Sequence, residues 1–342
     1  MRFSEYMNDW LYGESGYYTK FIEIGKEGDF YTAVSSSMFF GGSIANRLIK
    51  VIDEGYLTPN TLVVEIGAHQ GYMLADMVQF VYTLRPELLE SLRFGIVEPQ
   101  YENHLKQAEY FKESFGDVVK LEHFKSLQEV DEKEAFVVAN EIFDAFSCEI
   151  VKDGKMLYMD GQKAYFDTQT PQIEEICKTR GIKSGEIGVG YGLFAGSLAK
   201  AFKKYEFVTF DYGDLTRRDD MSLRIYHKHK SYPFFALTDF VTVDKEKIKD
   251  TTLGELFKNS DITYDVDFKF LIDEFEANGS KCLMFKTQLA ALIEFGITDL
   301  LDMLAKNSDE QTYKSELNRA KVLINPTFMG ERFKCVIFRK EE

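Results

Sequence analysis

Short apolar runs alternate with amphipathic stretches along the first 140 residues. Two stretches, Tyr72–Thr83 and Tyr101–Phe115, have the 3.6-residue periodicity of helices. The apolar runs that flank them are strand-like: Thr61–Ile66, Phe94–Glu98, Val118–Leu121 and Ala135–Asn140. Runs without polar alternation predict strands that are buried on both faces. Because helices separate them, we expect a parallel sheet with helices on both sides.

The pattern changes after residue 145. Three short runs at 148–151, 155–158 and 163–166 predict small antiparallel strands, with an Asp153-Gly154 turn between the first two. A glycine-rich stretch from Gly181 to Gly196 precedes helical residues that reach Lys204. Strand-like runs return at 207–211, 281–285 and 334–338. Counting the core strands gives seven, around residues 63, 95, 119, 137, 209, 283 and 336. This order predicts an α/β fold with a mostly parallel, doubly wound sheet.

We expect one core sheet with insertions on its substrate side instead of two independent domains. Residues 1–145 hold an N-terminal helical segment and the first half of the core, and 146–204 hold inserted antiparallel strands and helices. Residues 205–342 complete the core and carry a surface insertion near 230–275. Within that insertion, residues 243–258 are rich in charge and are expected to be solvated.

Composition and charge narrow the class of protein. The 342 residues are 45 % hydrophobic, which is too apolar for intrinsic disorder. The 41 Lys and Arg against 56 Asp and Glu give a formal charge of −15, which disfavours nucleic acid as a partner. No apolar run is long enough to span a membrane. With four scattered cysteines and no signal-like start, we expect a cytoplasmic protein. The oligomeric state stays open, a homodimer included.

The turn after the first predicted strand reads Glu65-Ile66-Gly67-Ala68-His69-Gln70-Gly71. Glycines at such a turn let the backbone approach a ligand closely. Because the spacing differs from G-x-G-x-x-G, a nucleotide-dependent oxidoreductase is the weakest alternative. An acidic residue before spaced glycines is similar to the S-adenosyl-L-methionine (SAM) loop of methyltransferases. A purely structural turn explains the glycines as well.

Glu98 ends the second predicted strand, where a carboxylate can accept both ribose hydroxyls of a nucleoside. A solvated strand-end carboxylate is the alternative. Asn140, Glu141 and Asp144 follow the strongest strand, and a helical start would place Glu141 and Asp144 on one face. Two carboxylates suit the fixed donors of a guanidinium. Capping of a helix start is the alternative.

Taken in order along the chain, the motifs resemble the MidA-like family of SAM-dependent methyltransferases, to which the mitochondrial complex I assembly-factor methyltransferase belongs. The resemblance is carried by Phe3–Tyr18, Gly28–Thr32, Val63–Met77, Val97–Pro99, Asn140–Ala145, Asp211–Gly213, Ser222–His229, Asp261–Phe268, Thr287–Gln288 and Met329–Lys334. It implies a seven-stranded, Rossmann-like SAM-binding fold. It also implies methylation of an arginine side chain in a protein, with a respiratory complex I subunit as target.

The resemblance also assigns site residues. Around SAM it places Thr32, Glu65, Gly67, Gly71 and Glu98, and it turns Asn140 and Glu141 toward the reactive methyl group. The chain departs from the family pattern at His69, where a glycine is usual, and at Ser147, where a proline is usual. His69 motivates the alternative of a non-catalytic assembly or chaperone-like protein that keeps the fold.

Four further residues are candidates for the substrate side. Asp211 and Tyr212 end the fifth core strand, where turn chemistry explains them equally well. Arg224 and His229 belong to a local basic cluster, which is either a docking surface for an acidic partner or a solvated loop. No histidine pair has metal-binding spacing, so no metal site is expected.

Overall fold

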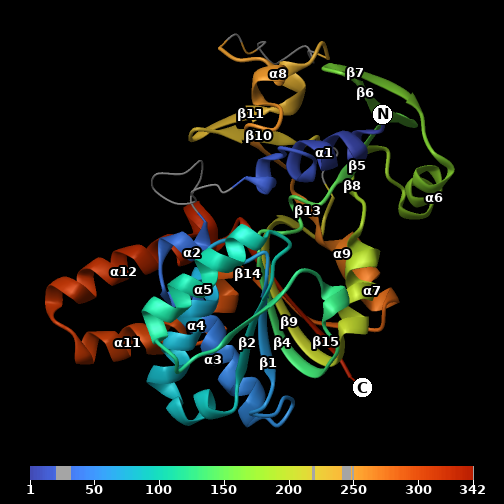
Figure 1. The fold of residues 1–342 in the computed structure, drawn as a ribbon. Coiled ribbons are helices and arrows are strands. Elements are labelled where there is room, and N and C mark those ends of the chain that lie inside the picture. The colour runs from blue at the N-terminus through green and yellow to red at the C-terminus, as the bar shows by residue number, and fades with distance from the viewer. Residues whose placement is uncertain (21–31, 218–219, 241–247, 249, 342) are drawn as a thin grey trace. The chain divides into compact units, whose positions relative to one another are not determined.

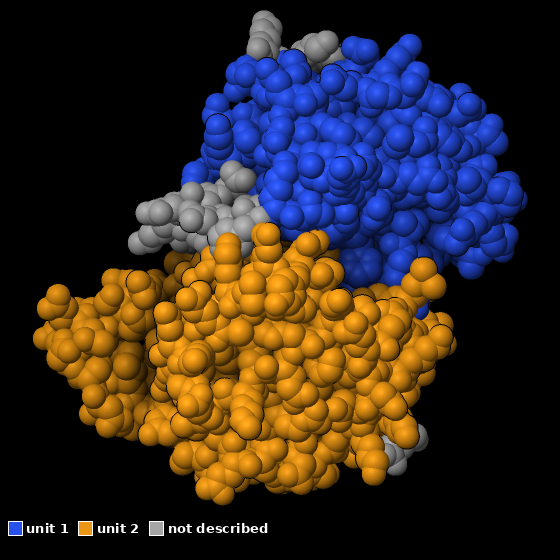
Figure 2. All heavy atoms as spheres, viewed as in Figure 1, with its two compact units in different colours: residues 1–30, 143–192, 213–271 blue, residues 31–142, 193–212, 272–342 orange. Residues whose placement is uncertain are grey.

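The protein is described by a computed structural model that covers residues 1–342 except 21–31, 218–219, 241–247, 249 and 342. The motif residues 28–31, and residues 243–247 and 249 of the charge-rich segment 243–258, therefore lie outside the described residues. The chain forms two units, coloured separately in Figure 2. Unit 1 contains residues 1–30, 143–192 and 213–271, and unit 2 contains 31–142, 193–212 and 272–342. This division places residues 1–30 with the insertions, whereas the sequence pattern groups them with the core.

Unit 2 is built on the central sheet of seven strands, which confirms the predicted fold class (Figure 1). The strands are β1 Leu62–Ile66, β2 Arg93–Val97, β3 Leu121–Phe124, β4 Glu132–Asn140, β9 Phe202–Asp214, β14 Lys281–Thr287 and β15 Phe333–Lys340. Their order across the sheet is β14-β15-β9-β4-β1-β2-β3. All neighbouring pairs from β9 to β3 are parallel, and β15 is antiparallel to both of its neighbours.

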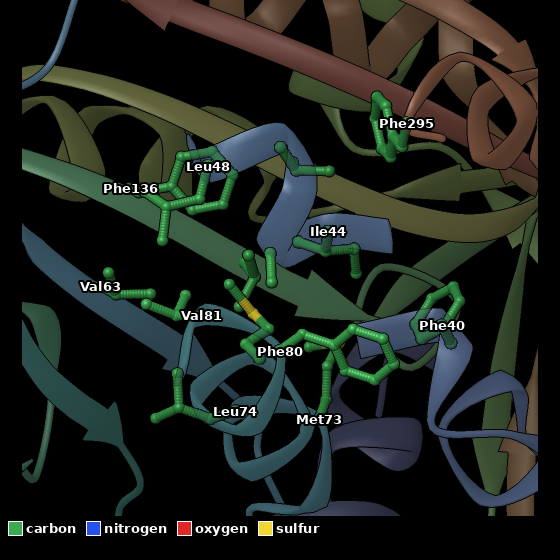
Figure 3. Close-up of a cluster of buried hydrophobic side chains, with 14 of the residues drawn as sticks. Phe40, Ile44, Leu48, Val63, Met73, Leu74, Phe80, Val81, Phe136 and Phe295 are labelled. Atoms are coloured by element: carbon green, nitrogen blue, oxygen red, sulfur yellow. The ribbon is translucent and has the colours of Figure 1, made fainter. Parts of the chain in front are cut away.

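Helices cover both faces of this sheet (Figure 1). They are α2 Ala33–Ser36, α3 Phe39–Asp53, α4 Tyr72–Leu84, α5 Tyr101–Phe115, α7 Tyr191–Ala201, α9 Phe268–Ala277, α10 Gln288–Glu294, α11 Ile297–Asn307 and α12 Glu310–Ile324. On one face, side chains of α3 and α4 pack with Val63 and Phe136 of the sheet, as Figure 3 shows. On the other face, Phe194 of α7 and Phe275 of α9 contact the ring of Phe207 on β9. Burial on both faces explains why these strands are continuous apolar runs.

One buried charge cluster ties elements of unit 2 together. Glu206 on β9 has a fully buried side chain, and its carboxylate accepts hydrogen bonds from Arg47 of α3 at 2.7 Å and from Arg339 of β15 at 2.6 Å. A buried carboxylate needs such partners, because its desolvation is otherwise too costly. The cluster therefore fixes α3 and β15 relative to the central strand.

Unit 1 contains two small antiparallel sheets, with strand orders β7-β6-β5-β8 and β11-β10-β12. Its elements are α1 Phe3–Tyr12, β5 Cys148–Lys152, β6 Lys155–Asp160, β7 Lys163–Thr168, α6 Pro171–Arg180, β8 Ser184–Gly188, β10 Arg224–His227, β11 Lys230–Pro233, α8 Leu253–Leu256, β12 Asp261–Thr263 and β13 Val266–Asp267. The predicted turn has positive φ at Asp153 and Gly154, which suits a tight hairpin. The indole Nε1 of Trp10 donates to the Ser260 carbonyl at 2.7 Å, which joins α1 to the segment before β12.

Candidate functional site

The order of strands in unit 2 reverses between β1 and β4. β1 pairs with β2 on one side and with β4 on the other, so consecutive chain segments leave β1 in opposite directions. Ligands of open α/β sheets bind at this switch point, outside the carboxyl ends of the strands. The loops after β1 and β4 meet here, because a Cβ atom on Gly67 would approach Cγ2 of Ile142 to 3.0 Å.

The loop from Gly67 to Gly71 has an unusual backbone. φ is +71° at Gly67, +49° at His69 and +78° at Gly71. The Gly71 amide donates to the Ala68 carbonyl at 2.7 Å, which closes a turn around His69. Left-handed backbone costs a residue with a side chain about 1–2 kcal/mol. The positive φ at His69 therefore gives a physical reason why glycine is usual at this position in the family that the motifs resemble.

Glu65 lies on β1, two residues before Gly67, and its side chain contacts the helix that follows the loop. Its side chain is buried on β1, and Oε2 accepts a hydrogen bond from the Leu74 amide of α4 at 3.0 Å. Burial raises the pKa of this carboxyl to about 8. Glu65 thus links the strand to the first turn of the helix on the two sides of the glycine loop.

Glu98 follows β2 directly. Its amide donates to the Phe124 carbonyl at 2.9 Å, and its carboxylate Oε1 accepts from the Gln100 amide at 2.9 Å. Only 6 % of the residue is exposed, and burial raises the pKa of the carboxyl. The carboxylate is therefore held at the carboxyl end of β2, one strand from the glycine loop.

The segment after β4 does not start a helix, so the helical arrangement considered for Glu141 and Asp144 is not found. Glu141 has φ +52° and its amide donates to the Phe210 carbonyl of β9 at 2.8 Å, so the chain turns instead of starting a helix. Asn140 Nδ2 donates to Glu141 Oε1 at 2.8 Å. The Asn140 Oδ1 atom is buried, and it has no hydrogen-bond partner among the described residues. Asp144 belongs to unit 1, where its carbonyl accepts from the Tyr264 amide at 3.3 Å.

The other predicted residues fall in three places. Thr32 is the N-cap of α2, where its hydroxyl accepts from the Ser35 amide at 3.2 Å. Asp211 is fully buried on β9, and its carboxylate accepts from the Tyr212 amide at 2.9 Å. Arg224 and His229 both lie in unit 1. The Arg224 guanidinium pairs with Asp265 at 2.7 Å, and His229 is exposed in the turn between β10 and β11, with φ +63°.

Three polar residues beside the glycine loop were not predicted. Gln107 of α5 is fully buried, and its Nε2 donates to the His69 carbonyl at 2.7 Å. Its Oε1 accepts from Nε2 of His123 on β3 at 3.0 Å. His104, one turn earlier on α5, donates from Nε2 to the Glu98 carbonyl and stacks on His123 with 4.6 Å between ring centroids. The sequence signal is that Gln107 shares the inner face of α5 with Phe111, four residues later.

Among the described residues, no group of three or more His, Cys, Asp and Glu side chains is arranged to hold a metal ion. None of the helices described is long and apolar enough to cross a membrane.

Comparison with known proteins gives consistent results. Residues 44–286 match the model of a family described as "Putative S-adenosyl-L-methionine-dependent methyltransferase". Two relatives are named protein arginine methyltransferase NDUFAF7, mitochondrial: that of Xenopus laevis is 24 % identical and that of Xenopus tropicalis 22 %. In both cases the match covers 97 % of this chain, with 79 % of the first relative and 80 % of the second.

The fold also matches solved structures. A COG1565 superfamily member from Burkholderia thailandensis, bound to S-adenosyl-homocysteine, superposes with a TM-score of 0.80 at 22 % identity. That match covers 99 % of this chain and 88 % of the other. A second COG1565 structure from the same organism gives a TM-score of 0.78 at 21 % identity, with 99 % and 87 % covered.

Proposed function

The chain belongs to this family of SAM-dependent methyltransferases, and we propose that it transfers the methyl group of SAM to an arginine side chain of a protein. The observation that carries the proposal is the arrangement of the glycine loop, Glu98 and Asn140 at the switch point of one sheet. The names of the two Xenopus relatives support the arginine part.

The residues present fit the cofactor. A Cβ atom on Gly71 would come within 3.3 Å of Ile96 and Phe111, so the loop backbone needs glycine there. In the proposal, Gly67 and Gly71 let the backbone approach the amino-acid part of SAM, and Glu98 accepts the ribose hydroxyls. The buried Oδ1 of Asn140 needs a donor, and a bound ligand would supply one.

The acceptor chemistry falls to the residues after β4. Bound SAM supplies an electrophilic methyl group on its sulfonium. Glu141 then orients the guanidinium, because a carboxylate matches the paired N–H donors of arginine. The attacking nitrogen loses one proton as it gains the methyl group, and we propose the Glu141 carboxylate as the acceptor of that proton. We propose Asp144, three residues further along the chain, as the second carboxylate that holds the guanidinium, and Asn140 as a further acceptor.

The nature of the protein substrate follows from charge. With a formal charge of −15, the chain attracts basic segments more readily than acidic ones. We propose a basic, arginine-bearing segment, and by family resemblance a respiratory complex I subunit is the first protein to test.

All four cysteines are free thiols, which supports the cytoplasm as the proposed compartment.

Transfer of labelled methyl groups tests the activity directly. The protein is incubated with labelled SAM and cell lysate, and the labelled band is analysed by mass spectrometry for methylarginine. Glu141→Gln is expected to lower the transfer rate by about 100-fold or more while the SAM dissociation constant changes less than about threefold. Glu113→Gln, on the exposed side of α5, is the matched control. Unchanged turnover in the Glu141 variant would remove that residue from the mechanism.

His69 favours a second candidate function, that of a non-catalytic assembly protein. A histidine at φ +49° strains the loop, because left-handed backbone is costly for a residue with a side chain. His69→Gly distinguishes the two. If the site is intact, calorimetry gives SAM affinity within about threefold of the parent. A gain of about 100-fold would support a degenerate site and the non-catalytic function.

A further inference from the structure

The strongest unassigned feature is the set of three polar residues on α5 and β3 beside the glycine loop. His104 and Gln107 are three residues apart on α5, so they share one face of the helix. Each donates a hydrogen bond to a backbone carbonyl of a different loop: His104 to Glu98, and Gln107 to His69. α5 therefore joins the loop after β1 to the loop after β2.

The direction of each hydrogen bond is fixed by its partners. The carbonyl oxygens of Glu98 and His69 only accept, so His104 Nε2 and Gln107 Nε2 carry the protons. The Gln107 amide can then offer only its oxygen to His123, whose Nε2 must donate. A flipped amide would place two acceptors against each other at His69, so the His69 carbonyl fixes the amide orientation, and the His123 tautomer that donates from Nε2 completes the arrangement.

The need for this bond comes from His69. A side-chain-bearing residue at φ +49° is disfavoured, and a buried hydrogen bond to its carbonyl offsets a cost of similar size. Glycine would pay no such penalty, but it would also leave the turn freer to move. The turn around His69 is thus held by Gln107, which lies outside the loop on α5.

We propose that Gln107, His104 and His123 are positioning residues that hold the glycine loop and Glu98 in the arrangement that binds SAM. None of the three needs to touch the cofactor, because each acts through a backbone carbonyl or through another member of the set. The inference rests on the cofactor site proposed above. It goes beyond it by assigning cofactor affinity to residues on α5 and β3.

The titratable groups around Gln107 belong to four elements: His104 on α5, His123 on β3, Glu98 after β2 and His69 in the glycine loop. Burial and the neighbouring His104 lower the pKa of His123 to about 4. His123 therefore stays neutral through the pH range in which binding is measured. The hydrogen bond from His123 to residue 107 should therefore not change with pH over this range. If a variant at position 107 makes the affinity depend on pH, the cause is then the new side chain.

Gln107→Glu tests the proposal by pH. A protonated carboxyl at position 107 can still donate to the His69 carbonyl, whereas an ionised one cannot and repels it. Calorimetry with S-adenosyl-homocysteine is expected to show affinity within about threefold of the parent near pH 5.5 and about tenfold weaker near pH 8.5. Gln79→Glu, on the exposed face of α4, adds the same charge and should leave the pH profile unchanged.

A pair of His123 variants tests the proposal independently if Gln107→Glu does not fold. His123→Gln keeps an N–H donor at the same reach and should bind S-adenosyl-homocysteine within about threefold of the parent. His123→Leu removes the donor and should bind about fivefold to tenfold more weakly. Thermal melts show whether each variant is folded at the assay temperature.

The outcomes separate this inference from the proposed function. Failure of the parent protein to bind S-adenosyl-homocysteine would overturn both. A parent that binds, with a Gln107→Glu profile parallel to its own or with equal affinities for the two His123 variants, would overturn the positioning role alone.

Discussion

At the scale of single residues, buried polar groups hold the backbone on both sides of the glycine loop. Glu65 is the clearest case, because its carboxyl is buried and accepts a hydrogen bond from the Leu74 amide of α4. Asp76, two residues further along the same helix, also has a pKa raised by burial, to about 7. Protonation of this region is therefore coupled to folding near neutral pH.

Glu65 gives a prediction with a definite sign. Its pKa in the folded protein is about 8, above the ordinary value of 4.5, so the native state holds its proton more tightly than the unfolded chain. The stability it contributes is full below pH 4.5 and is lost as pH rises through about 8. Glu65→Gln keeps the acceptor for Leu74 and cannot ionise. Relative to the parent, its free energy of unfolding should rise between pH 5 and pH 9 by on the order of 3 kcal/mol.

Urea denaturation of both proteins at pH 5, 7 and 9 measures this difference. Because Asp76 titrates in the parent and in the variant, its contribution cancels to first order. Parallel stability curves would show that Glu65 is ionised in the folded protein despite its burial.

At the scale of elements, amphipathic and apolar periodicity predicted the core well. The helix over Tyr101–Phe115 has the predicted bounds, and the seven core strands are all present. The third strand differs from its predicted position for a physical reason. The third strand was placed at Val118–Leu121, but Val118 is 76 % exposed and the strand is Leu121–Phe124, which contains a polar pair. The polar pair is Glu122, which is bonded to Arg93 of β2, and His123, which is bonded to Gln107 of α5, and these polar side chains hid the strand from the apolar pattern.

The strand β8 was missed because glycines mask it. Gly185 has φ +122°, and a Cβ atom on Gly188 would lie 2.4 Å from the Tyr191 ring. These glycines serve backbone geometry and close packing, which periodicity does not record. The same holds for the turn after β4, where the positive φ of Glu141 replaces the expected helix. The sequence does not single out Gln107 for a related reason. A buried glutamine cannot be distinguished from an exposed one until its hydrogen-bond partners are known.

At the scale of the whole molecule, the formal charge of −15 is the feature on which the proposed basic substrate depends. The family and the fold establish a SAM-dependent methyltransferase, and the seven-stranded sheet supplies its switch point. In the function that we propose, the acceptor is selected by residues outside that sheet and by the electrostatic field of the whole chain. Interaction between exposed charges weakens as salt rises, since the screening length falls from about 10 Å at 0.1 M to about 3 Å at 1 M.

If the substrate is a basic arginine-bearing segment, recognition should depend on salt. With a peptide whose arginine is flanked by lysines, KM should rise about threefold to tenfold between about 0.05 and 0.5 M NaCl, while kcat changes less than about twofold. A control peptide with the same arginine flanked by glutamines should show a KM that changes less than about twofold. The flanking lysines would act on the enzyme through long-range electrostatic attraction alone. Their charge should therefore change the binding of the peptide and not the rate of methyl transfer. Equal salt dependence for the two peptides would separate the net charge from substrate choice and leave recognition to short-range contacts alone.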